Sequence, residues 1–422
     1  MAAIDNNINI EQSLYRTSTY RKINIALTVV TILVTVSPYF GDLVPTSAKS
    51  MLVAAWHINA FIFENKFKAF KFKSVYFVLS IWIVWCIFLR IAGYSSAEWG
   101  NYYIMIAMCD IIIKSFYVLN FYSDKEKLFL LRTIQIVFLV NVAHNLFLYI
   151  LNPYSFVSYY VHPEAYKGTN RISSAYFYQA FAFFVMGNVF LLRTEKILWC
   201  KMLEILSIIF PLSFMFLVVP RMTAIILLIL LLSLYVLQNT KKTVNKVAII
   251  VLVPAILAFV FLFADTIIES LPARLQIRAE SILYAFRGEE YYAESTSFMD
   301  RGELQLNSLR TWLNSDFQTF FIGKGLHLGS QYSDIIGQHA FITNYLAMYG
   351  CMGLLFVWYI FFKLRNIYLG AFKFTEVQKY AKSMFLGFLF LLCVSVGFHC
   401  IIGIAFFLFF ACINNNIINK ES

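Results

Sequence analysis

The sequence predicts an all-α, polytopic integral membrane protein of about twelve transmembrane helices, with one large periplasmic loop that contains short helices. Composition is the first reason, because 60% of the 422 residues are hydrophobic and 14% are charged, whereas about a quarter of a soluble domain is charged. The mean hydropathy is +0.70. The other reasons are a series of apolar runs and one long polar stretch, residues 265–340, that separates two apolar parts of the chain.

Apolar runs mark the expected helices in order, because about 20 apolar residues in a helix cross the hydrocarbon core. Before the polar stretch they cover residues 23–40, 47–63, 74–91, 102–120, 128–151, 174–192, 202–219, 222–237 and 247–264. After it come residues 341–362 and a longer run, 383–413. This last run is about twice the minimum for one helix, and Gly397 to His399 offers a turn. We therefore expect two short helices there; a single helix would reduce the total to about eleven.

The positions of the basic residues predict the topology. Lysine and arginine follow the second, fourth, sixth, eighth and tenth spans, whereas the connections at residues 41–46 and 92–101 carry almost none. We therefore expect both termini in the cytoplasm and the large loop on the outer face, together with a second loop at residues 152–173. The first span is expected to act as an uncleaved signal, since no cleavage site follows an apolar core near the N-terminus.

The chain is expected to form one structural unit of three parts, since no repeat and no linker to a second domain is visible. The parts are residues 1–264 with the N-terminal helices, 265–340 with the loop, and 341–422 with the C-terminal helices. Within the loop, Gly302 to Asn314 has leucines spaced for one apolar helix face. We expect this face to lie on the membrane surface, where the helix can serve as a lid.

The net charge of +11 does not indicate a nucleic-acid partner. The basic residues cluster at the ends of spans, where they orient a membrane protein with its positive charge in the cytoplasm. The clusters are Arg16, Arg21 and Lys22; Lys66, Lys68, Lys71 and Lys73; Lys241, Lys242 and Lys246; and Lys363, Arg365, Lys373, Lys379 and Lys382. We expect membrane lipids around the chain and no nucleic acid.

Several kinds of enzyme lack their usual residues in this sequence. It contains no Asp-x-Asp, no Gly-rich phosphate loop and no His-Glu-x-x-His, which argues against metal-dependent transfer, nucleotide hydrolysis and zinc proteolysis. The seven cysteines lie in or beside apolar runs, without disulfide or zinc spacing. We therefore expect neither a bound metal nor a cofactor.

Two residues at the membrane boundary are candidates for chemistry. Arg221 lies where only Pro220-Arg221 separates two apolar runs. A charge there is costly unless it is paired or faces water, so Arg221 is either a functional residue or an interfacial arginine that reaches lipid phosphate. His339 stands where the loop re-enters the membrane. An imidazole there can accept a hydroxyl proton near neutral pH, although a lone interfacial histidine is more often a polar anchor.

Other polar residues fall inside the expected spans. Asp110 and Lys114 lie four residues apart in one helix, a spacing that favours a structural ion pair across one turn. His57, Arg90 and His144 are also in or near spans. For each of these three, hydrogen bonding to a neighbouring helix is a simpler prediction than catalysis.

Short motifs follow one another in a fixed order between residues 170 and 353. They are Asn170-Arg171-Ile-Ser173 and Arg221-Met-Thr223-Ala224 before the loop; Arg301-Gly-Glu-Leu304, Gly323-Lys-Gly325 and Gln338-His339 within it; and Asn344-Tyr345 with Tyr349-Gly350-Cys-Met-Gly353 after it. In this order, and in the number of spans and the outward loop, the chain resembles the O-antigen polymerase and O-antigen ligase family, the Wzy-like membrane glycan polymerases. Pro220 stands where the family often has serine.

Two arginines of this chain could correspond to the arginine that the family has in its large loop. The interval between Arg301 and Gly323 is longer than is usual in the family, so either Arg301 or Arg310 is the equivalent residue. Arg301 is preferred, because Leu304 and Ser308 follow it in the family's order.

The resemblance implies a function and a set of roles. Family members transfer glycans from a polyprenyl diphosphate carrier on the outer face of the inner membrane, without metal or nucleotide. Arg221 and Arg301 would bind the leaving diphosphate, because one guanidinium group can donate two parallel hydrogen bonds to phosphate oxygens. His339 would accept the proton of the attacking sugar hydroxyl, with inversion at the anomeric carbon. Arg171, Arg310 and Tyr345 are the expected substrate-binding residues.

The expected function is therefore an O-antigen or related polysaccharide polymerase in the bacterial inner membrane, with its active site in the periplasm. Its expected partners are polyprenyl-diphosphate-linked oligosaccharides, membrane lipids and, as the resemblance suggests, a chain-length regulator protein. Alternatives are an O-antigen ligase acting on lipid A core or protein, a transporter of lipid-linked oligosaccharides, and a structural partner in an envelope complex. Transporters commonly show paired halves and charged midplane sites, and no such symmetry is visible.

Overall fold

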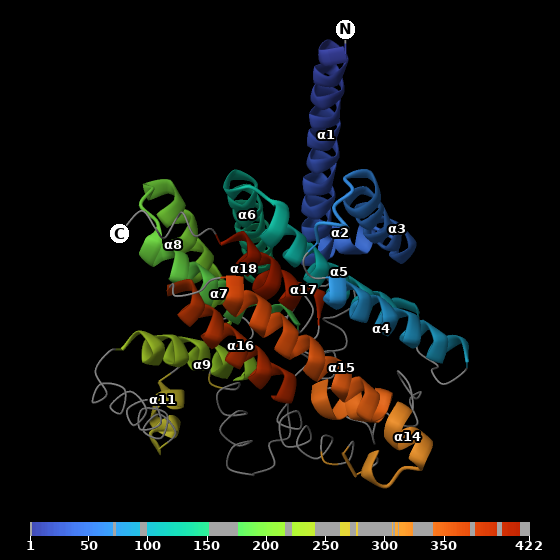
Figure 1. Ribbon diagram of the computed structural model, residues 1–422. Helices are drawn as coiled ribbons and strands as arrows, with labels where there is room; N and C mark the ends of the chain where they lie inside the picture. The colour runs from blue at the N-terminus through green and yellow to red at the C-terminus, as the bar shows by residue number, and fades with distance from the viewer. Residues whose placement is uncertain are drawn as a thin grey trace. The chain divides into compact units, whose positions relative to one another are not determined.

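The computed structural model describes residues 2–70, 73–92, 99–151, 176–215, 222–240, 262–270, 276, 306, 309–310, 312–323, 341–371, 376–394 and 399–413. Every regular element within these ranges is a helix (Figure 1), so the all-α prediction is confirmed for them. The helices are α1 (Ala2–Val36), α2 (Pro38–Leu43), α3 (Thr46–His57), η1 (Ile58–Phe63), α4 (Lys73–Ile91), α5 (Trp99–Phe121), α6 (Asp124–Leu151), α7 (Tyr176–Thr194), α8 (Leu198–Ser213), α9 (Met222–Asn239), α11 (Ala264–Glu269), α14 (Phe317–Ile322), α15 (Phe341–Ala371), α16 (Glu376–Val394), α17 (Cys400–Gly403), η4 (Ile404–Leu408) and α18 (Phe409–Cys412).

Several of these helices can cross a membrane. Among the described residues, 5 helices contain a stretch that is long and apolar enough: Thr19–Val36, Asp124–Leu148, Phe177–Thr194, Tyr349–Ala371 and Glu376–Val394. Shorter apolar helices are Lys73–Leu89, Ala224–Asn239 and Cys400–Cys412. By their length and composition, the helices that the structure describes are those of an all-α membrane protein.

The last apolar run contains two described helices, α16 and a C-terminal helix that begins after the extended residue His399. Most of the turn expected at Gly397 to His399 lies outside the described residues. The His399 side chain caps that helix by accepting a hydrogen bond from the Ile401 N–H at 3.3 Å. Most of the expected span at 247–264, and most of the loop at 265–340, lie outside the described residues. The described part of the loop contains the short helix α14, and α11 begins at its edge.

The helices group into two compact units that do not follow chain order. The first comprises Met1–Val84, Trp99–Asn141 and His399–Ser422. In it α1 packs against α3 and η1, and α5 packs against α3 and against the helix built from α17, η4 and α18. A Cβ on Gly403 would lie 2.7 Å from the Met108 Sδ, so glycine permits this close approach of α17 to α5.

A buried carboxylate joins three segments of the first unit. Glu64 accepts hydrogen bonds from the Arg21 Nε at 2.7 Å, from the Asn24 Nδ2 at 2.7 Å and from the Tyr117 hydroxyl. Asn59 donates to the Asn24 Oδ1 at 2.8 Å. The π-helical turn η1 brings these polar side chains to one face, because the Glu64 N–H binds the Asn59 carbonyl five residues back at 2.8 Å.

Arg21 is held from several sides in the same unit. Besides Glu64, its guanidinium donates to the Phe121 carbonyl and lies 5.4 Å from the centre of the Tyr122 ring. Burial raises the pKa of the Tyr122 phenol, so the ring stays neutral beside the cation. A second carboxylate, Glu126, lies 3.5 Å from Arg21. The arginine therefore ties α1 to the end of α5 and the start of α6.

The second unit comprises Trp85–Glu98 and Val142–Phe398. In it α7 packs against α8 and α9, α9 packs on α16, and α15 packs on both α16 and the short helix α14. The Phe190 and Tyr380 rings stack with centroids 4.7 Å apart. A Cβ on Gly387 would lie 2.4 Å from the Leu231 Cδ2, so α9 and α16 approach closely at this glycine.

Removing the Glu64 carboxylate should destabilise the protein far more than removing that of Glu126. Glu64→Ala leaves Arg21, Asn24 and Tyr117 without their common acceptor, at a cost of about 3 kcal/mol. Glu126 is partly exposed and also binds the Ser123 N–H at 2.7 Å at the start of α6, so Glu126→Ala should cost about 1 kcal/mol. Thermal unfolding of the purified variants in detergent measures the difference. Equal losses of stability would show that the Glu64 contacts do not hold the first unit together.

Candidate active site

The predicted site residues fall mostly in the large loop and at its borders. Arg171, Arg221, Arg301 and His339 lie outside the described residues. Arg310 and Tyr345 are described, together with the helix pair that joins the loop to the following span. Their roles in substrate binding stay predictions, and the surrounding geometry can be built from the residues upward.

The described end of the loop is a compact turn followed by α14. The Asp316 side chain starts the helix by accepting a hydrogen bond from the Thr319 N–H at 2.6 Å. The Trp312 indole donates to the Phe320 carbonyl at 3.0 Å, and the two rings stack with centroids 4.5 Å apart. These contacts fold residues 312–323 onto themselves. The helix ends at Gly323, whose φ of 82° is a conformation that favours glycine.

Gly350 is the point where α14 meets α15. Its backbone has φ 60° and ψ −156°, outside the helical region although it lies within α15. A Cβ at this position would lie 2.4 Å from the Phe321 carbonyl carbon and 2.6 Å from the Phe320 oxygen. Only glycine fits, both for its conformation and for the contact. Figure 1 shows α14 beside the first turns of α15.

This contact gives a physical reason for two glycines of the motif series. Gly323 lets the chain leave α14, and Gly350 lets α14 rest on α15. They come from motifs on opposite sides of the part of the loop that contains His339. The short helix α14 itself is not predicted by the sequence analysis, although the Asp316 cap and the glycine after Ile322 are signals for it.

Tyr345 lies in the first part of α15 and is buried, with 7% of its surface exposed. Its ring packs against that of Tyr349, with centroids 4.8 Å apart. The kink at Gly350 brings Gly353 back against this part of α15, since a Cβ on Gly353 would lie 2.4 Å from the Tyr349 Cβ and 3.3 Å from the Tyr345 carbonyl oxygen. In this structure the Tyr345 ring therefore contributes to packing next to the Gly350 contact.

Arg310 lies just before the compact turn, and its side chain is exposed. Its carbonyl accepts a hydrogen bond from the Asn314 N–H at 2.9 Å. The backbone is thus tied to the turn while the guanidinium faces solvent. This placement suits a residue that binds an anionic group, but it leaves the choice between Arg301 and Arg310 open.

The first unit contains a separate set of charged residues. The predicted ion pair is confirmed: the Lys114 Nζ lies 2.5 Å from the Asp110 Oδ2. Lys114 also donates to the Thr31 hydroxyl at 2.9 Å, and the other Asp110 oxygen lies 3.1 Å from the His57 Nε2. His57 thus bonds to a neighbouring helix as predicted. These charges are paired with one another.

The other two polar residues of the spans give less information. His144 is exposed on α6, and the side chain of Arg90 lies outside the described residues. No group of three or more His, Cys, Asp and Glu side chains suited to a metal ion occurs in the described ranges.

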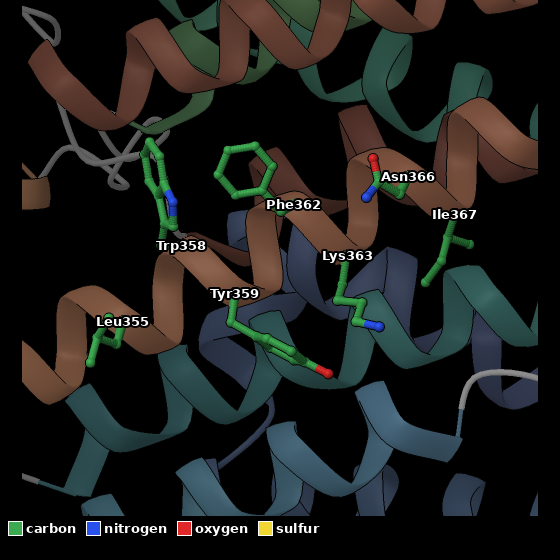
Figure 2. A pocket seen from close by; sticks show the side chains of 7 residues that line it. All are labelled: Leu355, Trp358, Tyr359, Phe362, Lys363, Asn366 and Ile367. Atoms are coloured by element: carbon green, nitrogen blue, oxygen red, sulfur yellow. The ribbon is translucent and has the colours of Figure 1, made fainter.

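A hollow of about 560 Å³ lies along one face of α15 (Figure 2). It is lined by Leu355, Trp358, Tyr359, Phe362, Lys363, Asn366 and Ile367. The Lys363 ammonium lies 5.7 Å from the centre of the Tyr359 ring. The lining carries no carboxylate or imidazole that could move a proton, and it lies within a membrane-spanning stretch. This hollow is therefore a poor place for glycosyl transfer.

A scan of known protein families finds no family model that matches the chain, and a search of curated proteins finds no match either. The family resemblance therefore rests on the order of the sequence motifs and on the expected topology.

Alanine at Gly350 should disrupt the junction between the loop and the membrane helix. Gly350→Ala places a methyl group into the Phe320–Phe321 backbone and into a strained conformation. The matched control is Gly370→Ala in the same helix, where a Cβ meets nothing within 4 Å. The control should be neutral or stabilise by up to about 1 kcal/mol. Protease sensitivity of residues 312–323 in the folded protein measures the effect, and equal cleavage of both variants would contradict the contact.

Proposed function

We propose that the protein is a membrane glycosyltransferase that polymerises polyprenyl-diphosphate-linked oligosaccharide repeat units, as an O-antigen or related polysaccharide polymerase. The proposal includes a bundle of about twelve transmembrane helices, with the reaction at the periplasmic face of the bacterial inner membrane. The observation that carries it is the ordered motif series, in which Gly323 and Gly350 belong to a single helix junction beside the loop. Both motifs therefore contribute to one local structure.

The proposed chemistry needs no metal, because arginine can take the place of a metal ion beside phosphate. A hydroxyl oxygen of the acceptor sugar attacks the anomeric carbon, and the bond from that carbon to the diphosphate oxygen breaks. The polyprenyl diphosphate leaves with the bonding electrons, and Arg221 and Arg301 stabilise its negative charge. His339 takes the hydroxyl proton. Attack from the face opposite the leaving group inverts the anomeric configuration.

The remaining candidates have binding roles in this proposal. Arg171 would hold the diphosphate of the acceptor, and Arg310, which is exposed, would bind either diphosphate. Tyr345 is buried in the first part of α15 and would support this binding site through packing. A chain-length regulator would be a protein partner. None of these roles calls for a nucleic acid or a cofactor.

Alanine at Arg221, Arg301 and His339 should abolish long glycan chains while the protein still inserts into the membrane. Each variant is expressed in cells that lack the native gene, and the glycans are separated on gels. We expect products with a single repeat unit, because each variant removes charge stabilisation or proton transfer worth about a hundredfold in rate or more. Arg310→Ala should have the smaller effect if Arg301 is the loop arginine.

Arg365→Ala is the matched control, since Arg365 lies at the far end of α15 and donates to its neighbour Asn366 at 3.3 Å. It should give wild-type chain lengths. Wild-type lengths from all of the site variants would refute the proposed site. Long chains that accumulate on the carrier would instead identify a ligase, because a ligase acts after polymerisation.

A further inference from the structure

The segment of residues 312–323 exposes large apolar side chains. Leu313 is 56% exposed, Phe317 80% and Phe321 41%. The two phenylalanines form a pair, with ring centroids 4.7 Å apart. In water, exposed side chains of this size forgo about 1.5–3 kcal/mol each of hydrophobic stabilisation. Gathered in one short segment, they indicate a surface that contacts something apolar.

The exposed pair cannot simply fold inward, because the other side of the segment is already packed. Phe320 stacks on Trp312, and the backbone at Phe320 and Phe321 rests on Gly350. Phe317 and Phe321 are four residues apart, so they lie on one side of α14. The contacts with Trp312 and Gly350 fix which side that is.

The membrane helix α15 determines the depth of this segment relative to the bilayer. Its membrane-spanning stretch, Tyr349–Ala371, has 23 residues, which corresponds to about 34 Å of helix and to a hydrocarbon core of about 30 Å. This stretch begins at Tyr349, eight residues later than the span at 341–362 that the sequence predicted. Gly350 is therefore in the first turn of the span, at one edge of the bilayer. Because α14 rests on Gly350, the exposed phenylalanines are held at the level where headgroups meet acyl chains.

The charge of the segment indicates whether it contacts lipid headgroups or lipid acyl chains. Residues 312–323 contain one acid, Asp316, and no lysine or arginine. The segment is therefore not suited to attract anionic headgroups, and its contact with lipid must be apolar. Polar side chains between the phenylalanines, such as Gln318, are exposed as well and can face the water.

We propose that residues 312–323 form an interfacial anchor in which Phe317 and Phe321 enter the lipid leaflet beside the start of α15. The occupant of this surface is the upper acyl region of a phospholipid bilayer. The anchor holds the described end of the loop at the membrane surface through Gly350. The anchor does not depend on the reaction that we propose for the loop. The test of the anchor is therefore independent of the test of the proposed function.

The test places a fluorescent probe in the full-length protein. Phe317→Cys and Gln318→Cys are each labelled with an NBD maleimide and reconstituted into phosphatidylcholine vesicles, and labelling of the wild-type cysteines is subtracted. The probe at 317 should be quenched strongly by a lipid nitroxide near the headgroup and weakly by aqueous iodide. The probe at 318 should show the opposite order. Phe321→Cys, which keeps Phe317, repeats the measurement in case removal of one ring loosens the anchor.

The outcomes separate lipid from other occupants. Replacing part of the phosphatidylcholine with phosphatidylglycerol should leave the quenching unchanged, because the segment has no basic residue. Iodide quenching at 317 and 321 equal to that at 318 would overturn the proposal. Protection from iodide without quenching by lipid would also overturn it, because a protein partner or a second copy of the chain would then cover the surface.

Discussion

The first unit depends on the way in which α1, the η1 turn and α5 share the carboxylate of Glu64. A carboxylate in apolar surroundings is costly unless its oxygens are hydrogen-bonded and its charge is paired. Arg21 supplies the charge, and Asn24 and Tyr117 supply further donors. Since these partners come from segments far apart in the chain, the requirement to satisfy one acid also brings those segments together.

The same requirement separates charges that hold the fold from charges that can act on a substrate. In the first unit Asp110 is bonded to both Lys114 and His57, and Lys114 has further contacts with Thr31 and the Trp56 ring. A cation held in this way is poorly placed to bind an incoming diphosphate. The exposed Arg310 differs from it, and it lies in the polar stretch where the motif series predicts chemistry.

Sequence periodicity and composition were sufficient for the parts of the structure that depend on local rules. Most described helices follow apolar runs, and the pair of Asp110 and Lys114 follows from a spacing of four residues. An exception is α1, which begins at Ala2 and so includes polar residues that precede the expected span at 23–40. The role of Glu64 was not predictable in this way, because Arg21 is distant in sequence and the η1 turn alters the helical spacing between Asn59 and Glu64. No local pattern connects such residues.

In the candidate site too, features that depend on local sequence were predictable and contacts between distant residues were not. The glycines at 323 and 350 were visible as motif residues, but their contact through α14 depends on a close approach of two backbones that no spacing encodes. The buried position of Tyr345 was likewise not predictable, since an aromatic residue at a loop border is suited to either packing or stacking on a sugar.

The proposed function requires that this chain alone joins lipid-linked repeat units without a metal ion. The most direct measurement supplies the purified protein, in vesicles containing a chelator, with a polyprenyl-diphosphate-linked repeat unit, and determines both the glycan length and the free polyprenyl diphosphate. The proposed function predicts oligomers on the carrier, with one polyprenyl diphosphate released for each new glycosidic bond. Repeat units that remain single while crossing the bilayer would contradict it and would identify a transporter.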